Sequence, residues 1–525
     1  MFVSYIQSLS QRRARARAII PAAALVASSL VLAAFAPHTL HAEALASAEP
    51  AGAQPSLAAS PRDAALSDAQ IREDLDLARR TLEQMHPGYT RYTSAETLDA
   101  LWVEGEAQAL AQGTRGGVYL AVSRLLARIR CDHTKAELPG DFEEARQSEP
   151  LYLPFRYAIF DKRMIVTNPG ATGLVRGEIV SAIDGEPVAD IIDKVFALFP
   201  VDGDTDHIKG ESVSEFGEFL GPAFEHFYPF LYETSGAVTL TLGDGREVSL
   251  DRLTYPDFAA ITGQKRFSQN FADSVTFTLL NERAAYLSVD TFVNYRKPVA
   301  PDTVYQPIFE TLARSGRDTL IVDLRRNGGG STDAQIGLVQ WLMPEAFQQA
   351  EAVLVKSNRI DPAIRPHLSS WNEAALSPDP AWFKQRADGM FEITNPLAGK
   401  PPASIAAKPG AFKGRLIVLT SSDNASGVTH LLSVLRTQRD ATFIGERTGG
   451  AATGATAGIL AFLTLPNSKA KVRVPLQRTV IAKAQDLDPR GGITPDILAP
   501  DTATSVLAGV DPAMIAALDF IAAGE

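Results

Sequence analysis

The sequence predicts an α/β fold in which a domain built on a mixed, mostly parallel sheet follows a helical N-terminal unit and a small β-rich domain. Three observations support this prediction. Apolar residues recur at helical spacing between residues 67 and 128, short strand-like runs fill 150–255, and strands alternate with helices from residue 265 onward. Such alternation is typical of parallel strands joined by helices.

The helical unit is predicted over residues 67–148. Ser67 and Gln70 fit a capping box, in which two side chains satisfy each other's backbone N–H groups at the start of a helix. Apolar residues follow them at helical spacing. Further helices are expected over 101–112 and 117–128.

The next unit, residues 150–255, is predicted to contain short strands and one helix around 191–198. Its central strand lies between two turns, in the pattern Gly173, Gly177-Glu178-Ile179 and Asp184-Gly185. This spacing resembles the core of a PDZ-like domain, a module that binds peptide tails by adding them to an exposed sheet edge. Any small β-rich domain with an Asp-Gly hairpin turn is the alternative.

The last unit, residues 265–525, carries the alternating strands and helices. Its expected strands cover 285–289, 319–324, 353–357, 415–420 and 442–445, and its expected helices cover 304–314, 332–342 and 427–436. Residues 358–412 are rich in proline and show little periodicity. We interpret them as an insertion or a lid.

The N-terminus is typical of an export signal. Four arginines lie between Arg12 and Arg17, an apolar run over 19–36 follows them, and small residues offer cleavage after Ala42 or Ala46. We therefore expect a signal peptide over 1–42, a disordered linker over 43–66, and a periplasmic or secreted protein. An uncleaved membrane anchor is the alternative, because the apolar run is nearly long enough to span a bilayer.

Charge and cysteine content exclude several kinds of partner. The formal net charge is −11, and without the four arginines of residues 1–42 it becomes −15. An acidic protein repels nucleic acid and anionic lipid, so neither is expected as a partner. Cys131 is the single cysteine, and the histidines are scattered without metal-binding spacing. The sequence predicts no disulfide framework, metal or cofactor, and the oligomeric state stays open.

Two strand-to-loop junctions carry unusual residues. The first ends in Asn327-Gly328-Gly329-Gly330, whose backbone N–H groups can approach a ligand closely because glycines have no side chain. The second ends in Ala425-Ser426-Gly427 directly before a helix. There a serine among small residues fits a nucleophile, and the helix N-terminus favours developing negative charge. A flexible loop and an ordinary N-cap serine are the alternatives.

Taken together, the two junctions resemble the tail-specific (C-terminal processing) serine protease family. The resemblance rests on Asp323-Leu324-Arg325, Asn327 and Gly329-Gly330, on Ser426, on 441–450, and on Gly492-Ile493-Thr494-Pro495-Asp496. It implies a sheet domain of the crotonase-like ββα spiral type that hydrolyses peptide bonds in protein or peptide substrates. It also implies Ser426 as the nucleophile, and an oxyanion hole formed by the N–H groups of Gly329 or Gly330 and of Gly427.

The expected base differs from that of the better-known branch of the family, which uses a Ser–Lys dyad. The lysine position falls on Ala451, and no lysine occurs between Lys413 and Lys469. Asp132-His133-Thr134 instead resembles the tricorn and interphotoreceptor retinoid-binding protein-like branch, which implies His133 as the general base. Histidine titrates near neutral pH and suits this role. His430 is the rival, although its position in the expected helix suggests packing.

The third catalytic group is expected among the acidic residues before the closing motif. We favour Asp488, with Asp486 second; Asp496, a backbone carbonyl or a water stay as alternatives. Cys131 is expected to be buried rather than nucleophilic. A catalytically inactive relative that binds peptide tails or apolar ligands is the alternative function, since the family includes retinoid-binding repeats.

Overall fold

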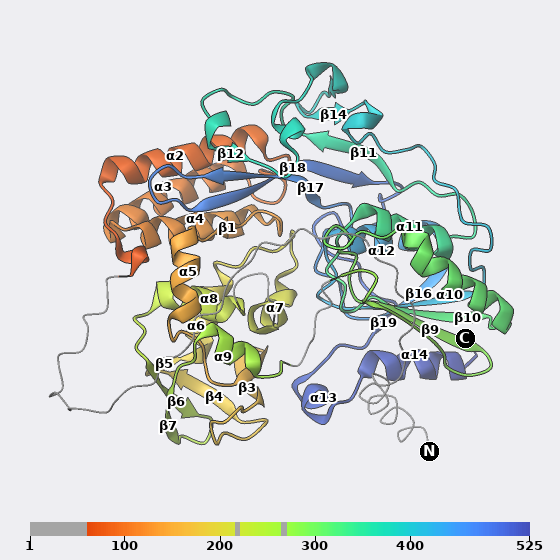
Figure 1. Ribbon diagram of the computed structural model, residues 1–525, viewed down its shortest axis with the longest axis horizontal. Helices are drawn as coiled ribbons and strands as arrows, with labels where there is room; N and C mark the ends of the chain where they lie inside the picture. Colours follow the sequence, from red (N-terminus) through yellow and green to blue (C-terminus); the bar gives the residue numbers. More distant parts are fainter. Residues whose placement is uncertain (1–59, 216–220, 264–269, 525) are drawn as a thin grey trace, which may run out of the picture. The chain divides into compact units, whose positions relative to one another are not determined.

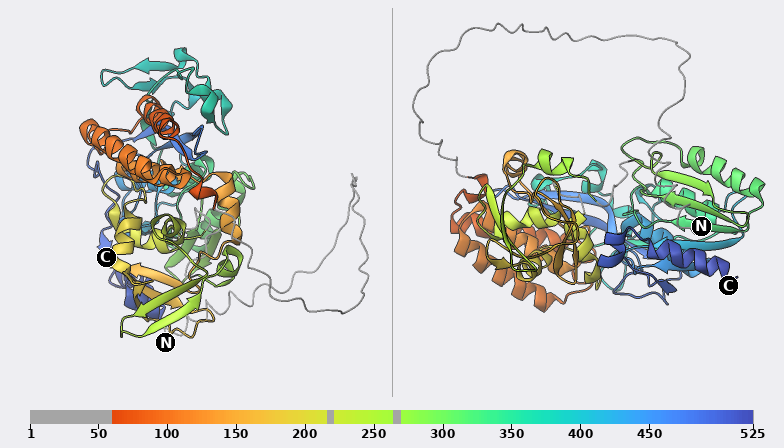
Figure 2. Two further views of the ribbon diagram at one scale, coloured as in Figure 1. Left: turned by 90° about the vertical axis from the view of Figure 1, so that its left-hand side faces the viewer. Right: turned by 90° about the horizontal axis from the view of Figure 1, so that it is seen from below.

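The structure is a computed structural model that describes residues 60–215, 221–263 and 270–524. The expected signal peptide and most of the expected linker lie outside the described residues. No helix in the described part of the chain is long and apolar enough to cross a membrane. The described residues contain three sheets (Figures 1 and 2).

The N-terminal helices agree with the prediction. The Ser67 capping box is present: its side chain accepts from the N–H of Gln70, whose side chain accepts from the N–H of Ser67. The next helix begins six residues earlier than expected because Ser94 caps it. Residues 60–66 of the expected linker include a short 3-10 helix beside the third helix. The elements are η1 Pro61–Asp63, α2 Asp68–Met85, α3 Ala95–Gln112, α4 Arg115–Ile129, β1 Ala136–Glu137 and α5 Gly140–Ser148.

An antiparallel sheet of order β2-β3-β4-β6-β7 forms the middle unit, with β5 paired to β4. Its expected strands are present, but α7, α8 and α9 were not predicted. Helix α7 packs against the edge strand β2, since a Cβ on Gly210 would lie 2.7 Å from the carbonyl oxygen of Ile159. The elements are β2 Arg156–Phe160, β3 Arg163–Asn168, β4 Ile179–Ile183, β5 Glu186–Pro187, α6 Val188–Phe196, η2 Asp206–Ile208, α7 Lys209–Glu215, α8 Ala223–Leu231, β6 Ala237–Leu242, β7 Glu247–Asp251 and α9 Tyr255–Ala260.

The C-terminal domain is built on the sheet β19-β16-β15-β10-β9-β8, in which β8 alone is antiparallel to its neighbour. This confirms the predicted mixed, mostly parallel sheet. The elements are β8 Val275–Leu279, β9 Ala284–Val289, α10 Pro301–Ser315, β10 Thr319–Asp323, α11 Thr332–Leu342, β15 Arg415–Thr420, α12 Ser426–Gln438, β16 Ala441–Gly445, β19 Ile497–Leu498, α13 Ala503–Ala508 and α14 Pro512–Ala522.

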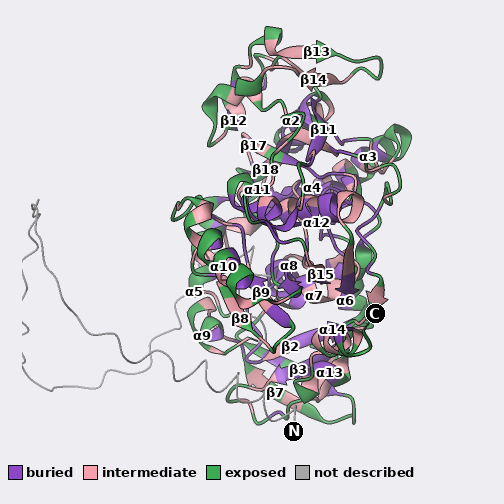
Figure 3. Ribbon diagram, turned by 90° about the vertical axis from the view of Figure 1, so that its right-hand side faces the viewer, coloured by how far each residue is buried: buried purple, intermediate pink, exposed green. Residues whose placement is uncertain are grey.

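Both faces of this sheet are covered, which explains why its strands are continuously apolar (Figure 3). On β10, Leu320 and Val322 belong to the core formed with α10, α11 and α12, whereas Ile321 belongs to the core formed with α14. Side chains of a strand alternate between its two faces, so both layers of helices are held by the same strand. The strand is therefore a fixed base for the loop that follows it.

A long hairpin, which the sequence analysis did not predict, forms the centre of the third sheet. Strands β17 Thr456–Thr464 and β18 Lys471–Ile481 pair with each other, and β18 also pairs with β1 and β11. Asp74 of α2 is fully buried and accepts from the backbone N–H groups of Asn467 and Ser468 at the hairpin tip. The hairpin thus fastens the N-terminal helices to the C-terminal domain.

The rest of that sheet comes from the proline-rich insertion 358–412 and the strand before it. These residues are ordered into short elements rather than one continuous loop (Figure 1). The elements are β11 Ala350–Val355, η3 Arg365–His367, β12 Leu368–Ser369, η4 Glu373–Leu376, η5 Pro380–Trp382, β13 Phe383–Gln385, β14 Phe391–Ile393 and η6 Pro396–Ala398.

Helix α8 carries a buried acid, Glu225, that predicts a pH dependence of stability. Burial raises the pKa of its carboxyl from 4.5 to about 7, although Tyr157 donates to Oε2 at 2.7 Å. The native state therefore keeps a proton that the unfolded state loses, and stability falls as pH rises from about 4.5 through about 7. Glu225→Gln should remove this fall, which amounts to on the order of 3 kcal/mol. Thermal melts between pH 5 and 8 measure it.

The exposed Glu233 provides the control. Glu233→Gln should follow the wild-type pH dependence. A Glu225→Gln protein with the same pH dependence as wild type would contradict the assignment.

Candidate active site

The parallel sheet places the glycine-rich junction and the serine-bearing junction beside each other. Strand β10 pairs with β15 in register, so that Asp323 lies opposite Leu419, and the loops after both strands leave from the same edge. Carboxyl ends of parallel strands are where α/β proteins place their reactive groups. Asp323 also accepts two hydrogen bonds from the guanidinium of Arg325, which pairs with Asp511 at the start of α14. This part of the motif is structural.

Ser426 begins α12 with an unusual backbone conformation. Its φ is +53°, a left-handed value that side-chain-bearing residues rarely adopt, and such a conformation costs about 1–3 kcal/mol. The residue before it, Ala425, is extended and caps the helix without a side-chain hydrogen bond. The first N–H groups of the helix are therefore free to meet a ligand. Ser426 is therefore a half-buried serine on a sharp strand-to-helix turn.

Two buried asparagines join the loops. Asn424, which is fully buried, donates from Nδ2 to the carbonyl oxygens of Leu324 (2.7 Å) and Asn327 (3.0 Å). Asn327 is also fully buried and donates from Nδ2 to the carbonyl oxygen of Val289 at 3.0 Å. The loop that carries Ser426 is thus fixed to the loop that carries the glycines. The sequence analysis did not assign either side chain this role.

The same asparagine selects between the two candidate oxyanion donors. The N–H of Gly329 donates to Asn327 Oδ1 at 2.8 Å and is occupied. The N–H groups of Gly330 and Gly427 have no hydrogen-bond partner among the described residues. Both lie next to Ser426, since a Cβ on Gly427 would come within 3.5 Å of the Gly330 nitrogen. Of the three predicted donors, Gly330 and Gly427 are therefore available.

Both Gly329 and Gly330 require glycine. Their φ values are +108° and +134°. A Cβ on Gly329 would lie 2.8 Å from Cβ of Ser426, and one on Gly330 would lie 2.4 Å from the carbonyl carbon of Phe292. Side chains here would strain the backbone and collide with the nucleophile or with the chain after β9.

His133 reaches Ser426 from the N-terminal unit. Its Nε2 lies 3.1 Å from Ser426 Oγ, across 293 residues of sequence. This is hydrogen-bonding distance, as a nucleophile and its general base require. The structure therefore brings together the two residues that the sequence analysis paired.

The segment around His133 is held on both sides. Cys131 Sγ donates to the carbonyl oxygen of Thr456 on β17 at 3.3 Å. Thr134 Oγ1 lies 2.7 Å from Nε2 of His86, whose Nδ1 accepts from the N–H of Gly88. The proton of His86 is therefore on Nε2, and burial lowers the pKa of His86 to about 3, which keeps this donor neutral.

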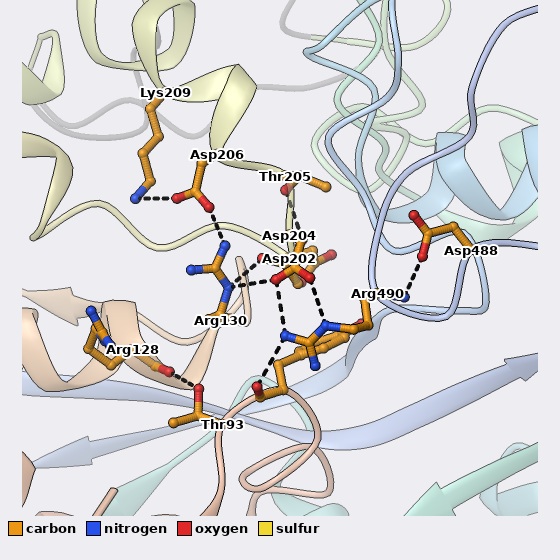
Figure 4. A network of polar contacts seen from close by, with 12 residues as sticks. Thr93, Arg128, Arg130, Asp202, Asp204, Thr205, Asp206, Lys209, Asp488 and Arg490 are labelled. Carbon is orange, nitrogen blue, oxygen red and sulfur yellow. Dashed lines mark hydrogen bonds and ion pairs between the residues drawn. The ribbon is translucent and has the colours of Figure 1, made fainter. Parts of the chain in front are cut away.

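The expected third group is not at His133. Nδ1 of His133 is buried and has no hydrogen-bond partner among the described residues. Asp488 instead accepts from Arg447 at 2.6 Å and from the backbone N–H of Arg490 (Figure 4). Asp496, an alternative, accepts from Arg436 and the N–H of Phe443. Both carboxylates pair with arginine side chains, and neither one hydrogen-bonds to the imidazole of His133.

The two residues expected to be structural lie beside the site, His430 partly buried and Cys131 buried. His430 lies on α12, and its Nε2 accepts from the N–H of Ala455 at 3.4 Å. Burial lowers the pKa of His430 to about 4, so it stays neutral. Cys131 is 2% exposed, and burial raises the pKa of its thiol, which argues against a thiolate nucleophile.

Comparison with known proteins finds a family match in the C-terminal domain. Residues 283–499 match the model of peptidase family S41. This segment runs from the start of β9 to just beyond β19 and contains both loops of the site. His133 lies outside it. No curated protein shows a significant sequence match to the chain.

Solved structures share a similar fold over most of the chain. Mature CPAF complexed with lactacystin has a TM-score of 0.58 at 14% identity, covering 86% of this chain and 97% of that chain. A CPAF mutant has a TM-score of 0.58 at 12% identity, and mature CPAF one of 0.54 at 13% identity; each covers 84% of this chain and 94% of that chain. At such identities the comparison shows a shared fold.

Asn327 gives a direct test of how the site is organised. Asn327→Ala leaves the N–H of Gly329 and the carbonyl of Val289 without their partners, so the glycine loop should lose its fixed position. We expect the rate of reaction at Ser426 with a fluorophosphonate to fall roughly 10–100-fold, by comparison with loss of an oxyanion donor. Rate constants for labelling measure this effect.

Asn467→Ala is the matched control, because this asparagine also makes several hydrogen bonds, to α2, but lies at the tip of the hairpin. It should react at the wild-type rate. Equal rates for Asn327→Ala and wild type would show that the asparagine does not position the loop.

Proposed function

We propose that the protein is a serine peptidase in which Ser426 is the nucleophile and His133 is the general base. The observation that carries this proposal is the 3.1 Å approach of His133 Nε2 to Ser426 Oγ, beside two unpartnered backbone N–H groups. The S41 family match and the shared fold with CPAF support a peptidase. His133 lies outside the residues of the family match, so its proposed role as the base is supported by this distance.

The reaction follows from these positions. Ser426 Oγ attacks the carbonyl carbon of a peptide bond, and its proton passes to Nε2 of His133 as the C–O bond forms. The N–H groups of Gly330 and Gly427 would hold the resulting oxyanion. The imidazolium then gives its proton to the amide nitrogen as the C–N bond breaks. Water hydrolyses the remaining ester with His133 again acting as base.

Related enzymes that use a Ser–Lys mechanism have a lysine as the base, and this chain has no lysine at the corresponding position. Ala451 occupies that position, and its backbone N–H donates to a carboxylate at 3.3 Å. A binding protein that has lost activity would need neither a strained Ser426 nor a histidine at hydrogen-bonding distance. These observations favour the catalytic alternative over an inactive relative.

A cavity of about 660 Å³ lies next to the loop before Ser426 and could admit a peptide. It is lined by the turn between β2 and β3, by α7, and by Ser422, Glu446 and Arg447. We propose that the substrate is a polypeptide passing between the sheet β2–β7 and the catalytic loops. The sheet would then act as the PDZ-like unit expected from the sequence, although α7 covers its β2 edge.

We also propose that the protein is exported. The arginines between Arg12 and Arg17, the apolar run after them and the small residues up to Ala46 support this proposal. In a bacterial host the mature protein should appear outside the cytoplasm, with an N-terminus after Ala42 or Ala46. Cell fractionation and N-terminal sequencing measure this. Full-length protein retained in the cytoplasm would contradict export.

The proposed chemistry predicts covalent labelling at one residue. A fluorophosphonate probe should label the wild-type protein, and Ser426→Ala should abolish labelling because the nucleophile is gone. His133→Ala should slow labelling and peptide hydrolysis roughly 10³-fold or more, as loss of the base does in other serine peptidases. Labelling rates and mass spectrometry of the labelled peptide measure both effects.

His367→Ala serves as the control, since this histidine lies in η3 of the insertion and hydrogen-bonds only through its backbone, to Ile364, among the described residues. It should retain wild-type labelling. A folded wild-type protein that is not labelled, or a Ser426→Ala protein that still is, would refute the proposed nucleophile.

A further inference from the structure

A buried carboxylate that the sequence analysis did not consider lies behind the catalytic pair. Asp202, between α6 and η2, is 2% exposed. Its Oδ1 accepts from the backbone N–H of Asp132 at 2.9 Å, and its Oδ2 accepts from that of Ala451 at 3.3 Å. Asp202 forms no ion pair with lysine or arginine among the described residues. A buried charge without such a pair is costly and calls for an explanation.

The two donors identify what Asp202 holds. Asp132 directly precedes the general base His133. Ala451 follows Gly449 and Gly450, whose N–H groups donate to the carbonyl oxygen of Asn424, two residues before the nucleophile. One carboxylate therefore links the segment of the base to the turn that supports the nucleophile loop. A hydrogen bond from a backbone N–H to each oxygen also fixes the orientation of the carboxylate.

The loop that carries Asp202 is itself fixed (Figure 4). Gly203 donates to the carbonyl oxygen of Arg130 at 3.0 Å and accepts from Arg130 Nε at 2.6 Å. The next acid, Asp204, pairs with Arg490 at 2.7 Å. Only glycine fits at 203, where φ is +53° and a Cβ would lie 2.1 Å from the carbonyl oxygen of Arg490. Asp202 is thus held in place from the helical unit and from the C-terminal domain.

Of the ionisable groups around Asp202, only the imidazole of His133 changes its charge in the proposed reaction. Burial and the neighbouring Asp132 raise the pKa of Asp202, and the imidazole of His133 opposes this rise. Asp132 is paired with the buried Lys135 at 3.3 Å. His430 faces His133 from α12 and stays neutral, as shown above. Burial also raises the pKa values of the two other facing groups, Tyr92 and Cys131, so that both stay neutral.

We propose that Asp202 is the positioning carboxylate of this site. It orients the segment of His133 through the N–H of Asp132, and its negative charge stabilises the imidazolium that forms when Ser426 gives up its proton. The role expected for Asp488 thus falls to a residue of the loop after α6. Asp202 acts through space, since Nδ1 of His133 has no hydrogen-bond partner among the described residues. The inference rests on the proposed Ser–His mechanism.

The test is Asp202→Asn, measured by the kcat, KM and pH profile of peptide hydrolysis. Loss of a negative charge beside the base should lower kcat about tenfold, which is the effect of one pH unit on a protonation equilibrium. KM should change less than twofold. The acid limb of the rate profile should move about one unit to lower pH, because the imidazolium is no longer stabilised. A structural role alone would not move that limb.

Asp193→Asn is the matched control, because this acid, on the helix that precedes the loop of Asp202, is half exposed and pairs with Lys162. It should keep the wild-type kcat and profile. Asp202→Glu restores the charge and should return the acid limb to its wild-type position. If Asp202→Asn does not fold, Asp202→Glu becomes the test. An acid limb displaced by one pH unit in Asp202→Glu would overturn the proposal.

Two further outcomes overturn it. One is an Asp202→Asn protein with unchanged kcat and acid limb. The other is a loss of rate that is equal at all pH values and accompanied by a lower melting temperature. Both differ from failure of the proposed function, which would appear as a wild-type protein that a fluorophosphonate does not label at Ser426.

Discussion

The hydrogen bonds of Asn327 and Asn424 are the constraint on which the candidate site depends. These two fully buried side chains hydrogen-bond five backbone groups, so removing either one would leave costly unpaired groups. They also allow the backbone of Ser426 to hold a left-handed conformation, since such strain persists only where the surroundings fix it. The parallel sheet brings the loops together, and the asparagines set their separation.

Much of this could be predicted from local sequence. The continuous apolar runs of β10 and β15, the glycines at 329 and 330, and the small residues around Ser426 are short-range signals with direct physical meanings. The capping box at Ser67 is another. The hairpin β17–β18 gave no comparable signal, because its strands are covered on parts of both faces by long-range partners and so lack clear alternation.

The polar groups around the base were harder to predict, for a related reason. Nothing in the local sequence of His133 indicates a partner 293 residues away, and only a family resemblance paired it with Ser426. Asp488 looked suitable by its position in the chain, but Arg447 neutralises it on the surface. Asp202 lies in an acidic loop that would pass for a solvated turn. Burial, which sequence alone does not reveal, separates it from Asp204 and Asp206.

The docking of the His133 segment on β17 and β18 also has a consequence for biosynthesis. The proposed base belongs to the N-terminal helical unit, whereas the hairpin that holds it is translated more than 300 residues later. A growing or truncated chain that ends between residues 426 and 456 contains both His133 and Ser426 but lacks the hairpin on which the His133 segment docks. The proposed activity would therefore be acquired only after the hairpin has been made, and shorter chains would not cut one another.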